Sequence, residues 1–277
     1  MEFTTDVVDR LSPHERRAVR ELAGRVAERD GAPPLSDESL VALAAPATHV
    51  LMRRDGTVQA YAQLRDGTAE LAAEADLEPL LDQIERLSAR LVWAHGRRSP
   101  VGPALEARRY RMVRELWQLR RPLADLRDAP VPPGVTLRAF RPGRDEDAWV
   151  AVNAAAFATH PEQGRMRRAD LEARMGEPWF DPAGLLMAWA GDDLVGFHWT
   201  KVHAGTPLGE VYVLAVAPAA QGQRLGAALL WAGLHHLAAA GCDTVLLYVD
   251  GDNAAAMALY EKAGFERYDL DAQYARR

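Results

Sequence analysis

The spacing between apolar residues changes several times along this chain, and each change predicts the start of a new strand or helix. The clearest change lies between Glu210 and Leu237. Residues 210–216 are apolar and rich in β-branched side chains, as a buried strand requires, and Pro218 ends the pattern. From Leu225 onward the apolar residues recur at helical spacing, which predicts a helix over 225–240. A strand, a short loop and a helix are therefore expected in succession.

The remaining patterns fall into two similar series on either side of residues 122–134, which hold four prolines in thirteen positions. In the first series, helices are predicted at 12–30, 36–43 and 77–90 and strands or extended segments at 49–52, 58–64, 68–73, 91–95 and 110–121. In the second series, strands are predicted at 135–140, 185–189, 194–201, 210–216, 245–249 and 265–270, and helices at 145–157, 169–175, 225–240 and 254–262. We interpret the series as two copies of one α+β unit.

The predicted fold class is thus α+β, with a mixed and mostly antiparallel sheet flanked by helices in each copy. The predicted domains are 1–121 and 135–277, joined by the proline-rich linker 122–134.

Composition narrows the class of protein. The net charge of −6 and the pI near 5.8 argue against general nucleic-acid binding. No apolar run is long enough to cross a membrane, and the N-terminus lacks the apolar core of a secretion signal, so a cytoplasmic monomer is expected. The single cysteine, Cys242, is expected to be a buried thiol, and the eight histidines show no metal-binding spacing, so no metal is expected.

The loop between the central strand and helix carries the most specific chemical signal. Its residues are Gln221-Gly222-Gln223-Arg224-Leu225-Gly226-Ala227. A glycine-containing loop at a helix N-terminus directs several amides and the positive end of the helix dipole at one place, which suits a pyrophosphate, and Arg224 adds a cation. The alternative is an ordinary strand–helix connection.

The equivalent stretch of the first half differs. It has no glycine between Gly67 and Gly96 and places Glu74, Asp76 and Glu78 where an anion would need amides. We expect that the first half has lost this site.

Two further residues have the chemistry of a proton-transfer site. Glu210 is a carboxylate on an otherwise apolar strand, which is costly unless it lies at an edge or has a function. It could act as a base through a water, or simply be an exposed residue at a strand end. Asn253 follows a strand, and Tyr260 lies two helical turns later on the same face. The phenol could protonate a thiolate, or its ring could pack in the core.

The loop resembles the acyl-CoA signature Q/R-x-x-G-x-G/A of the GCN5-related N-acetyltransferase (GNAT) family, with Arg224 where that pattern has its first glycine. The C-terminal helix resembles the closing signature of the same family through Asn253, Leu259, Tyr260, Gly264 and Phe265. The resemblance implies tandem GNAT domains and acetyl-CoA as co-substrate, with Glu210 as base and Tyr260 as acid. The implied acetyl-CoA contacts are the strand main chain and the two helix starts: Leu214, Ala215, Val216, residues 221–227, Asn253, Ala254, Ala255, Ala256, Met257 and Ala258.

Polar and aromatic stretches at 157–164, 179–184 and 196–201 extend the resemblance to tandem-repeat members of the family that acetylate the cysteinyl amine of Cys-GlcN-Ins. That resemblance implies a small-molecule substrate bound by Asp37, Glu162, Lys201, Glu210 and Tyr248. Two alternatives remain open: an acetyltransferase for another amine, such as an aminoglycoside or an amino acid, and a non-catalytic acyl-CoA-binding protein.

Overall fold

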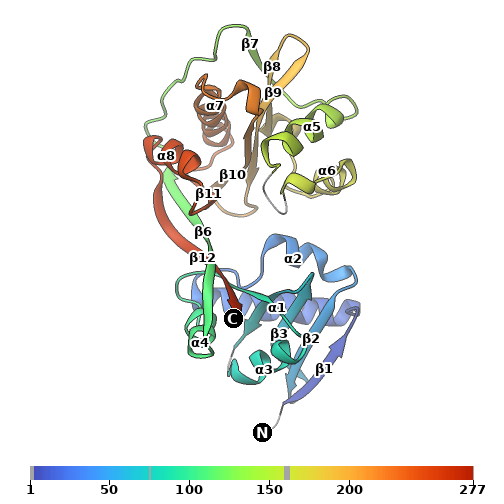
Figure 1. Cartoon of the computed structure of the whole chain (residues 1–277). Coiled ribbons are helices and arrows are strands. Elements are labelled where there is room, and N and C mark those ends of the chain that lie inside the picture. Colours follow the sequence, from blue (N-terminus) through green and yellow to red (C-terminus); the bar gives the residue numbers. More distant parts are fainter. Residues whose placement is uncertain (1–2, 75, 159–162, 277) are drawn as a thin grey trace. The chain divides into compact units, whose positions relative to one another are not determined.

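The computed structural model describes residues 3–74, 76–158 and 163–276, and its contacts divide the chain into two compact units (Figure 1). Unit 1 comprises Met1–Trp117, Asp250–Asp252 and Asp269–Arg277, and unit 2 comprises Gln118–Val249 and Asn253–Tyr268. Two long strands, β6 (Tyr110–Pro122) and β12 (Glu266–Arg276), contribute residues to both units.

The predicted C-terminal domain covers residues 135–277, whereas the contacts assign Asp269–Arg277 to unit 1. The cause is a strand pairing that no local pattern reveals: residues 272–275 of β12 pair antiparallel with residues 91–94 of the first half.

Unit 1 is a helix-flanked sheet with the strand order β1-β2-β3-β4-β5-β12. All neighbours in this order for which the register is known are antiparallel except β4 and β5, which are parallel. Its strands are β1 (Thr4–Val8), β2 (Thr48–Arg54), β3 (Thr57–Arg65), β4 (Thr68–Ala73) and β5 (Leu91–Ala94). Its helices are α1 (Pro13–Asp30), α2 (Asp37–Val41), α3 (Glu78–Arg86) and α4 (Val101–Ala107), with a 3₁₀ turn at Ala42–Ala44.

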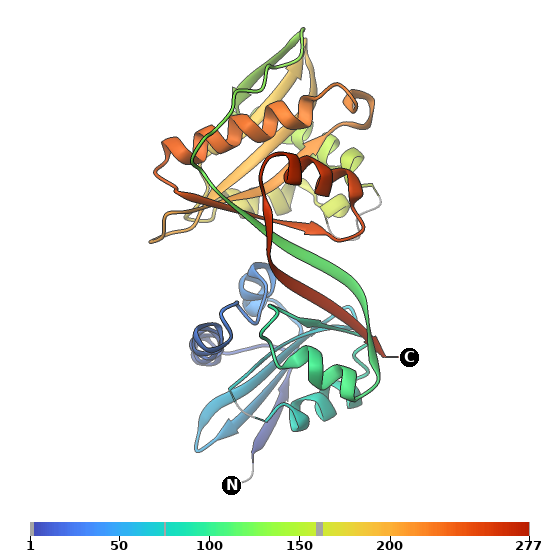
Figure 2. The same cartoon turned by 90° about the vertical axis from the view of Figure 1, so that its left-hand side faces the viewer.

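Alternating side chains of the unit 1 strands pack on two separate helical layers. Leu51 and Tyr61 face α1, whose Leu22 and Val26 are buried against them. Their neighbours, such as Val50, face α3 and α4 on the opposite side. Figure 2 shows α1 nearly end-on at one side of these strands, and α3 and α4 at the other. The helix α1 begins with the predicted capping box of Ser12 and Glu15, which satisfies two of the unpaired amides at its start.

Unit 2 repeats this plan with the strand order β11-β10-β9-β8-β7, in which only β10 and β11 are parallel. Its strands are β7 (Val135–Ala139), β8 (Leu185–Ala190), β9 (Asp193–Val202), β10 (Leu208–Val216) and β11 (Thr244–Asp250). Its helices are α5 (Glu146–Ala156), α6 (Arg168–Met175), α7 (Leu225–Ala239) and α8 (Ala254–Lys262), with 3₁₀ turns at Gln163–Arg165, Pro182–Gly184 and Pro218–Ala220.

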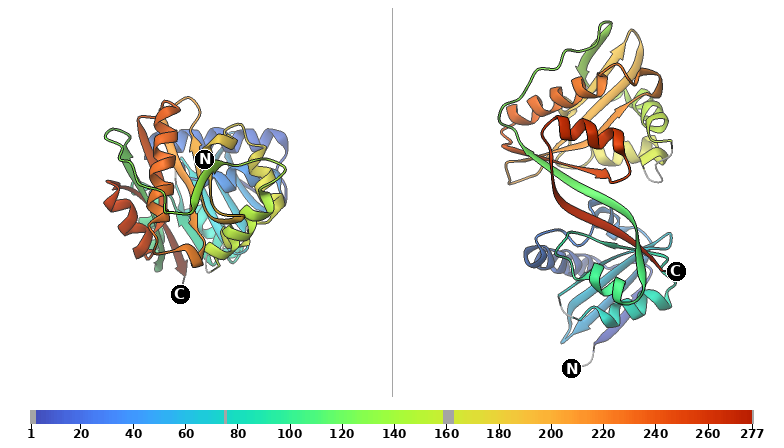
Figure 3. Two further views of the ribbon diagram at one scale, coloured as in Figure 1. Left: turned by 90° about the horizontal axis from the view of Figure 1, so that it is seen from above. Right: turned by 60° about the vertical axis from the view of Figure 1, so that its left-hand side comes forward.

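Strand β9 shows how this sheet is covered on both faces. Phe197 and Trp199 pack with Trp149 of α5 in one cluster, whereas the intervening His198 faces α7. The right-hand view of Figure 3 shows α7 and the α5–α6 pair on opposite sides of the strands. Gly233 of α7 permits this close approach, because a Cβ there would lie only 2.1 Å from the His198 ring.

The predicted fold class, a mixed and mostly antiparallel sheet flanked by helices in a tandem arrangement, is confirmed. Two elements were not predicted from the sequence, β1 and α4. The first is a polar edge strand, and the second is a short helix whose first turn contains glycine and proline.

Candidate active site

An open strand edge lies at the centre of unit 2. Strand β10 pairs with β9 along its whole length, but its parallel register with β11 covers only Leu208–Val211, opposite Thr244–Leu247. A β-bulge at Tyr212 interrupts the register with β9 at the point where the pairing with β11 ends. Bulges re-aim a strand and often occur beside functional sites. Beyond the bulge, β10 therefore presents one unpaired edge within the described part of unit 2.

The direction of the peptide groups on that edge follows from one hydrogen bond. The Ala217 amide donates to the Val195 carbonyl oxygen at 2.9 Å, so Ala215, two residues earlier, also faces β9. The peptide groups of Leu214 and Val216 then point to the unpaired edge. The Gln221 side chain donates to the Val216 carbonyl at 3.3 Å, which is consistent with this alternation. An extended ligand could pair with Leu214 and Val216 as an added strand would.

The loop after β10 has the backbone of an anion site. Within the described residues, the amides from Gly222 to Ala227 donate to no other group, as the first amides of a helix do. Gly222 and Arg224 both have left-handed backbones, with φ of 78° and 62°. Arg224 thus adopts the conformation that suits a glycine, at a cost of about 1–2 kcal/mol, and adds an exposed guanidinium. Strain of this kind is typical of functional loops.

Helix α8 packs near the start of α7, where the Leu259 side chain lies close to Gly226. Asn253 caps α8, with its Oδ1 accepting from the Ala256 amide at 3.1 Å, so it has a structural role whatever else it binds. Tyr260 is buried, and its ring packs edge-on against Phe265 at 5.7 Å. Burial raises the pKa of the Tyr260 phenol above its ordinary value, so the hydroxyl keeps its proton at neutral pH.

Glu210 lies at the start of β10 and is buried, so it is not the exposed strand-end residue of the alternative interpretation. It pairs directly across the strand with Lys201 of β9, whose Nζ lies 4.0 Å from Glu210 Oε2. The same oxygen lies 2.8 Å from His203 Nε2. His203 was not predicted as a site residue, although the short hairpin between β9 and β10 brings it close to Glu210.

Aromatic rings enclose the ammonium group of Lys201. Its Nζ lies 5.2 Å from the centre of the Trp179 ring and 5.6 Å from that of Tyr212, the bulged residue. The Tyr212 hydroxyl accepts a hydrogen bond from Arg174 Nε at 3.0 Å, which fixes the ring. Glu210, Lys201 and His203 therefore form a charged cluster against an aromatic wall.

The other predicted substrate residues are less closely grouped. Tyr248 is a half-exposed residue of β11 whose hydroxyl accepts from Gln118 Nε2 at 2.7 Å. Asp37 belongs to unit 1, where it begins α2. Glu162 lies outside the described residues. No contact between described atoms joins Tyr260 to Glu210 directly.

Within residues 3–74, 76–158 and 163–276, His, Cys, Asp and Glu side chains form no group suited to hold a metal ion. None of the described helices is both long and apolar enough to cross a membrane. Cys242 is buried and free.

The open edge, the amide-rich helix start and the buried carboxylate lie together in unit 2. In agreement, the profile of the Acetyltransferase (GNAT) family matches residues 149–265. The chain is 48% identical to the mycothiol acetyltransferase of Salinispora arenicola over 97% of this chain and 95% of that protein. It is 44% identical to the mycothiol acetyltransferase of Streptomyces avermitilis, over 95% and 92% of the two chains. The chain belongs to the mycothiol acetyltransferase family.

A solved structure shows the same tandem fold. The tandem GNAT protein from the clavulanic acid biosynthesis pathway superposes with a TM-score of 0.71 at 19% identity, covering 99% of this chain and 98% of that one. At this identity the likeness concerns the fold alone.

Proposed function

We propose that this enzyme transfers the acetyl group of acetyl-CoA to the cysteinyl α-amine of Cys-GlcN-Ins, giving mycothiol. The family relationship supports the reaction. The observation that supports this site is the position of Glu210. Its carboxylate is buried and lies one residue before the end of the pairing between β10 and β11.

The proposed roles follow from the proton balance. The substrate ammonium must lose a proton before its nitrogen can attack the thioester carbon, and Glu210 would accept it, directly or through a water. The carbon–sulfur bond then breaks, and Tyr260 would protonate the departing thiolate, whose conjugate thiol has a pKa near 8.5. The acetylated nitrogen would give up its second proton as the amide forms, which restores the Tyr260 hydroxyl. The proton accepted by Glu210 leaves to solvent, one per turnover. An α-amine has a pKa of about 7.7–8.0, so the base needs to supply only modest help.

Acetyl-CoA would lie along the open edge of unit 2. The peptide groups of Leu214 and Val216 would pair with its pantetheine arm, and one amide there would polarise the thioester carbonyl. The amides of residues 221–227 and the Arg224 guanidinium would bind the pyrophosphate. Residues 253–258 at the start of α8 would flank the arm.

For the acceptor, we propose binding within unit 2 by side chains predicted from the sequence: Glu162, Lys201, Glu210 and Tyr248. A polyol that carries an ammonium group suits carboxylates and hydroxyls of this kind.

A thiol-release assay tests the proposal. Purified protein and acetyl-CoA should release CoA rapidly with Cys-GlcN-Ins and slowly with aminoglycosides and free amino acids. Faster release with another amine would favour a different acceptor. Binding of acetyl-CoA without release with any amine would indicate an acyl-CoA-binding protein instead.

A further inference from the structure

His203 is held in place by the turn that joins β9 to β10. Its amide donates to the Leu208 carbonyl at 3.0 Å, and its carbonyl accepts from the Thr206 amide at 3.2 Å and from the Thr206 hydroxyl at 3.1 Å. The backbone of His203 is therefore fixed, and its ring lies against the carboxylate of Glu210 rather than in free solvent.

The two oxygens of Glu210 have different surroundings. Oε2 contacts both His203 Nε2 and Lys201 Nζ, whereas the described residues give Oε1 no hydrogen-bond partner. An ionised carboxylate only accepts hydrogen bonds, so Nε2 carries the hydrogen when His203 is neutral. This bond fixes the rotation of the carboxylate and leaves Oε1 for an incoming amine.

We propose that His203 is a positioning residue for Glu210. The inference rests on the proposed function, in which Glu210 accepts the amine proton. The bond from His203 to Oε2 holds the carboxylate in one rotation, so any effect of His203 on the reaction passes through Glu210.

The test compares the steady-state kinetics of His203→Gln and His203→Leu with those of the wild-type chain at pH 7.5, using Cys-GlcN-Ins as the amine. The glutamine amide can still donate to Oε2, so His203→Gln should keep kcat/KM within about threefold of wild type.

His203→Leu should lose about tenfold in kcat/KM at pH 7.5, since the orienting bond is gone. His235→Gln on α7 is the matched control, because His235 contacts the Arg127 carbonyl rather than this cluster. Its kcat/KM should equal that of wild type. Acetyl-CoA affinity, measured for each variant, shows whether unit 2 remains folded, and His203→Ala replaces the leucine variant if the latter fails this check.

Two results would overturn the inference: equal losses of activity in His203→Gln and His203→Leu, or equal activity of a folded His203→Leu variant and the wild type. Absence of turnover by the wild-type chain would instead contradict the proposed function.

Discussion

The two units place a glutamate at the same position of the same kind of sheet and surround it differently. Glu70 of β4 is opposite Gln63 of β3 and beside Trp93 of the parallel strand β5. Glu210 of β10 is opposite Lys201 and beside Leu246 of the parallel strand β11. The register thus makes Glu70 the counterpart of Glu210.

In unit 1, groups of the protein itself bind the Glu70 carboxylate. Glu70 accepts hydrogen bonds from the Ser36 amide at 2.6 Å and the Ser36 hydroxyl at 2.8 Å, and it lies 3.3 Å from His95 Nε2. The other ring nitrogen of His95 lies 3.0 Å from Asp271. Burial alone would lower the pKa of His95, but the two carboxylates outweigh it and raise that pKa to about 10. A protonated His95 therefore occupies the place beside Glu70 that a substrate ammonium would need.

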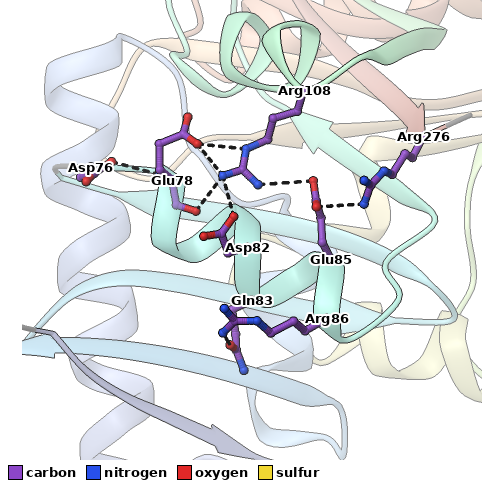
Figure 4. Close-up of polar contacts among 8 residues, drawn as sticks. All are labelled: Asp76, Glu78, Asp82, Gln83, Glu85, Arg86, Arg108 and Arg276. Carbon is purple, nitrogen blue, oxygen red and sulfur yellow. Dashed lines mark hydrogen bonds and ion pairs between the residues drawn. The ribbon is translucent and has the colours of Figure 1, made fainter.

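The strand edge and the helix start differ as well. The register of β4 with β3 is regular through Ala73, with no counterpart of the Tyr212 bulge. At the start of α3, Asp76 accepts from the Glu78 amide at 3.1 Å, so a carboxylate of the chain already lies where a phosphate would bind. Figure 4 shows Arg108 between Glu78, Asp82 and Glu85.

This arrangement refines the electrostatic expectation from the sequence. The acidic residues were expected to repel a pyrophosphate, but the structure pairs Glu78 with Arg108 and Glu74 with Arg25. Occupation of the helix start by Asp76 is therefore a stronger obstacle than charge repulsion. The comparison indicates that one fold carries a site only where its polar groups are left for a ligand.

The largest effect on kcat is expected from Glu210→Gln, compared with the matched variant Glu70→Gln. Glu210→Gln should lower kcat by about tenfold to a thousandfold near neutral pH, because general-base help is typically worth 10²–10⁴ and an α-amine needs less of it. The matched variant Glu70→Gln should lower the melting temperature and leave kcat nearly unchanged. Steady-state rates across pH measure both, and the loss in Glu210→Gln should shrink as the amine deprotonates. A pH-independent loss, or loss of acetyl-CoA binding, would contradict the assignment of Glu210 as base.

A smaller effect on the rate is expected from a change at Tyr260, the proposed general acid. Tyr260→Phe should slow the chemical step by about tenfold to a hundredfold while acetyl-CoA still binds, since only the hydroxyl is removed and the ring contact with Phe265 remains. Single-turnover measurements isolate this step. Equal rates for the two proteins would make Tyr260 a purely structural residue.

The smallest effect concerns the closed site of unit 1. The folded-state pKa of His95, about 10, exceeds the ordinary value of 6.5, so its contribution to stability is full below about pH 6.5 and is lost as pH rises through about 10. His95→Gln should therefore lower the melting temperature by several degrees at pH 6, on the order of 2–4 °C per kcal/mol lost. Thermal unfolding at pH 6 and pH 10 measures the difference. A deficit that does not shrink at pH 10 would show that His95 acts by packing rather than by charge.

Local patterns predicted most of the fold because each long helix or strand has its own spacing of apolar residues. Some helices also have a recognisable capping residue, such as Ser12 at the start of α1. They could not predict β1, whose residues are mostly exposed and polar, or the pairing of Ala272 with Ala94 across the length of the chain. The register of a distant strand depends on tertiary packing.

The candidate site was predictable to a similar degree. Glu210 and Tyr260 stand out by residue type and spacing, and the amide-rich loop by its glycines. The contact of His203 with Glu210 and the bulge at Tyr212 arise from hairpin geometry, and the left-handed backbone of Arg224 contradicts its residue type. Such features belong to the assembled sheet and not to any short stretch of sequence.

Isothermal titration of the full chain with acetyl-CoA tests most directly whether unit 2 alone retains the site. We predict a stoichiometry near one, with affinity lowered about tenfold in Arg224→Ala, which removes a charged phosphate ligand, and unchanged in Arg108→Ala. A stoichiometry near two, or a single site that weakens in Arg108→Ala and not in Arg224→Ala, would show that unit 1 binds the co-substrate and would contradict the account.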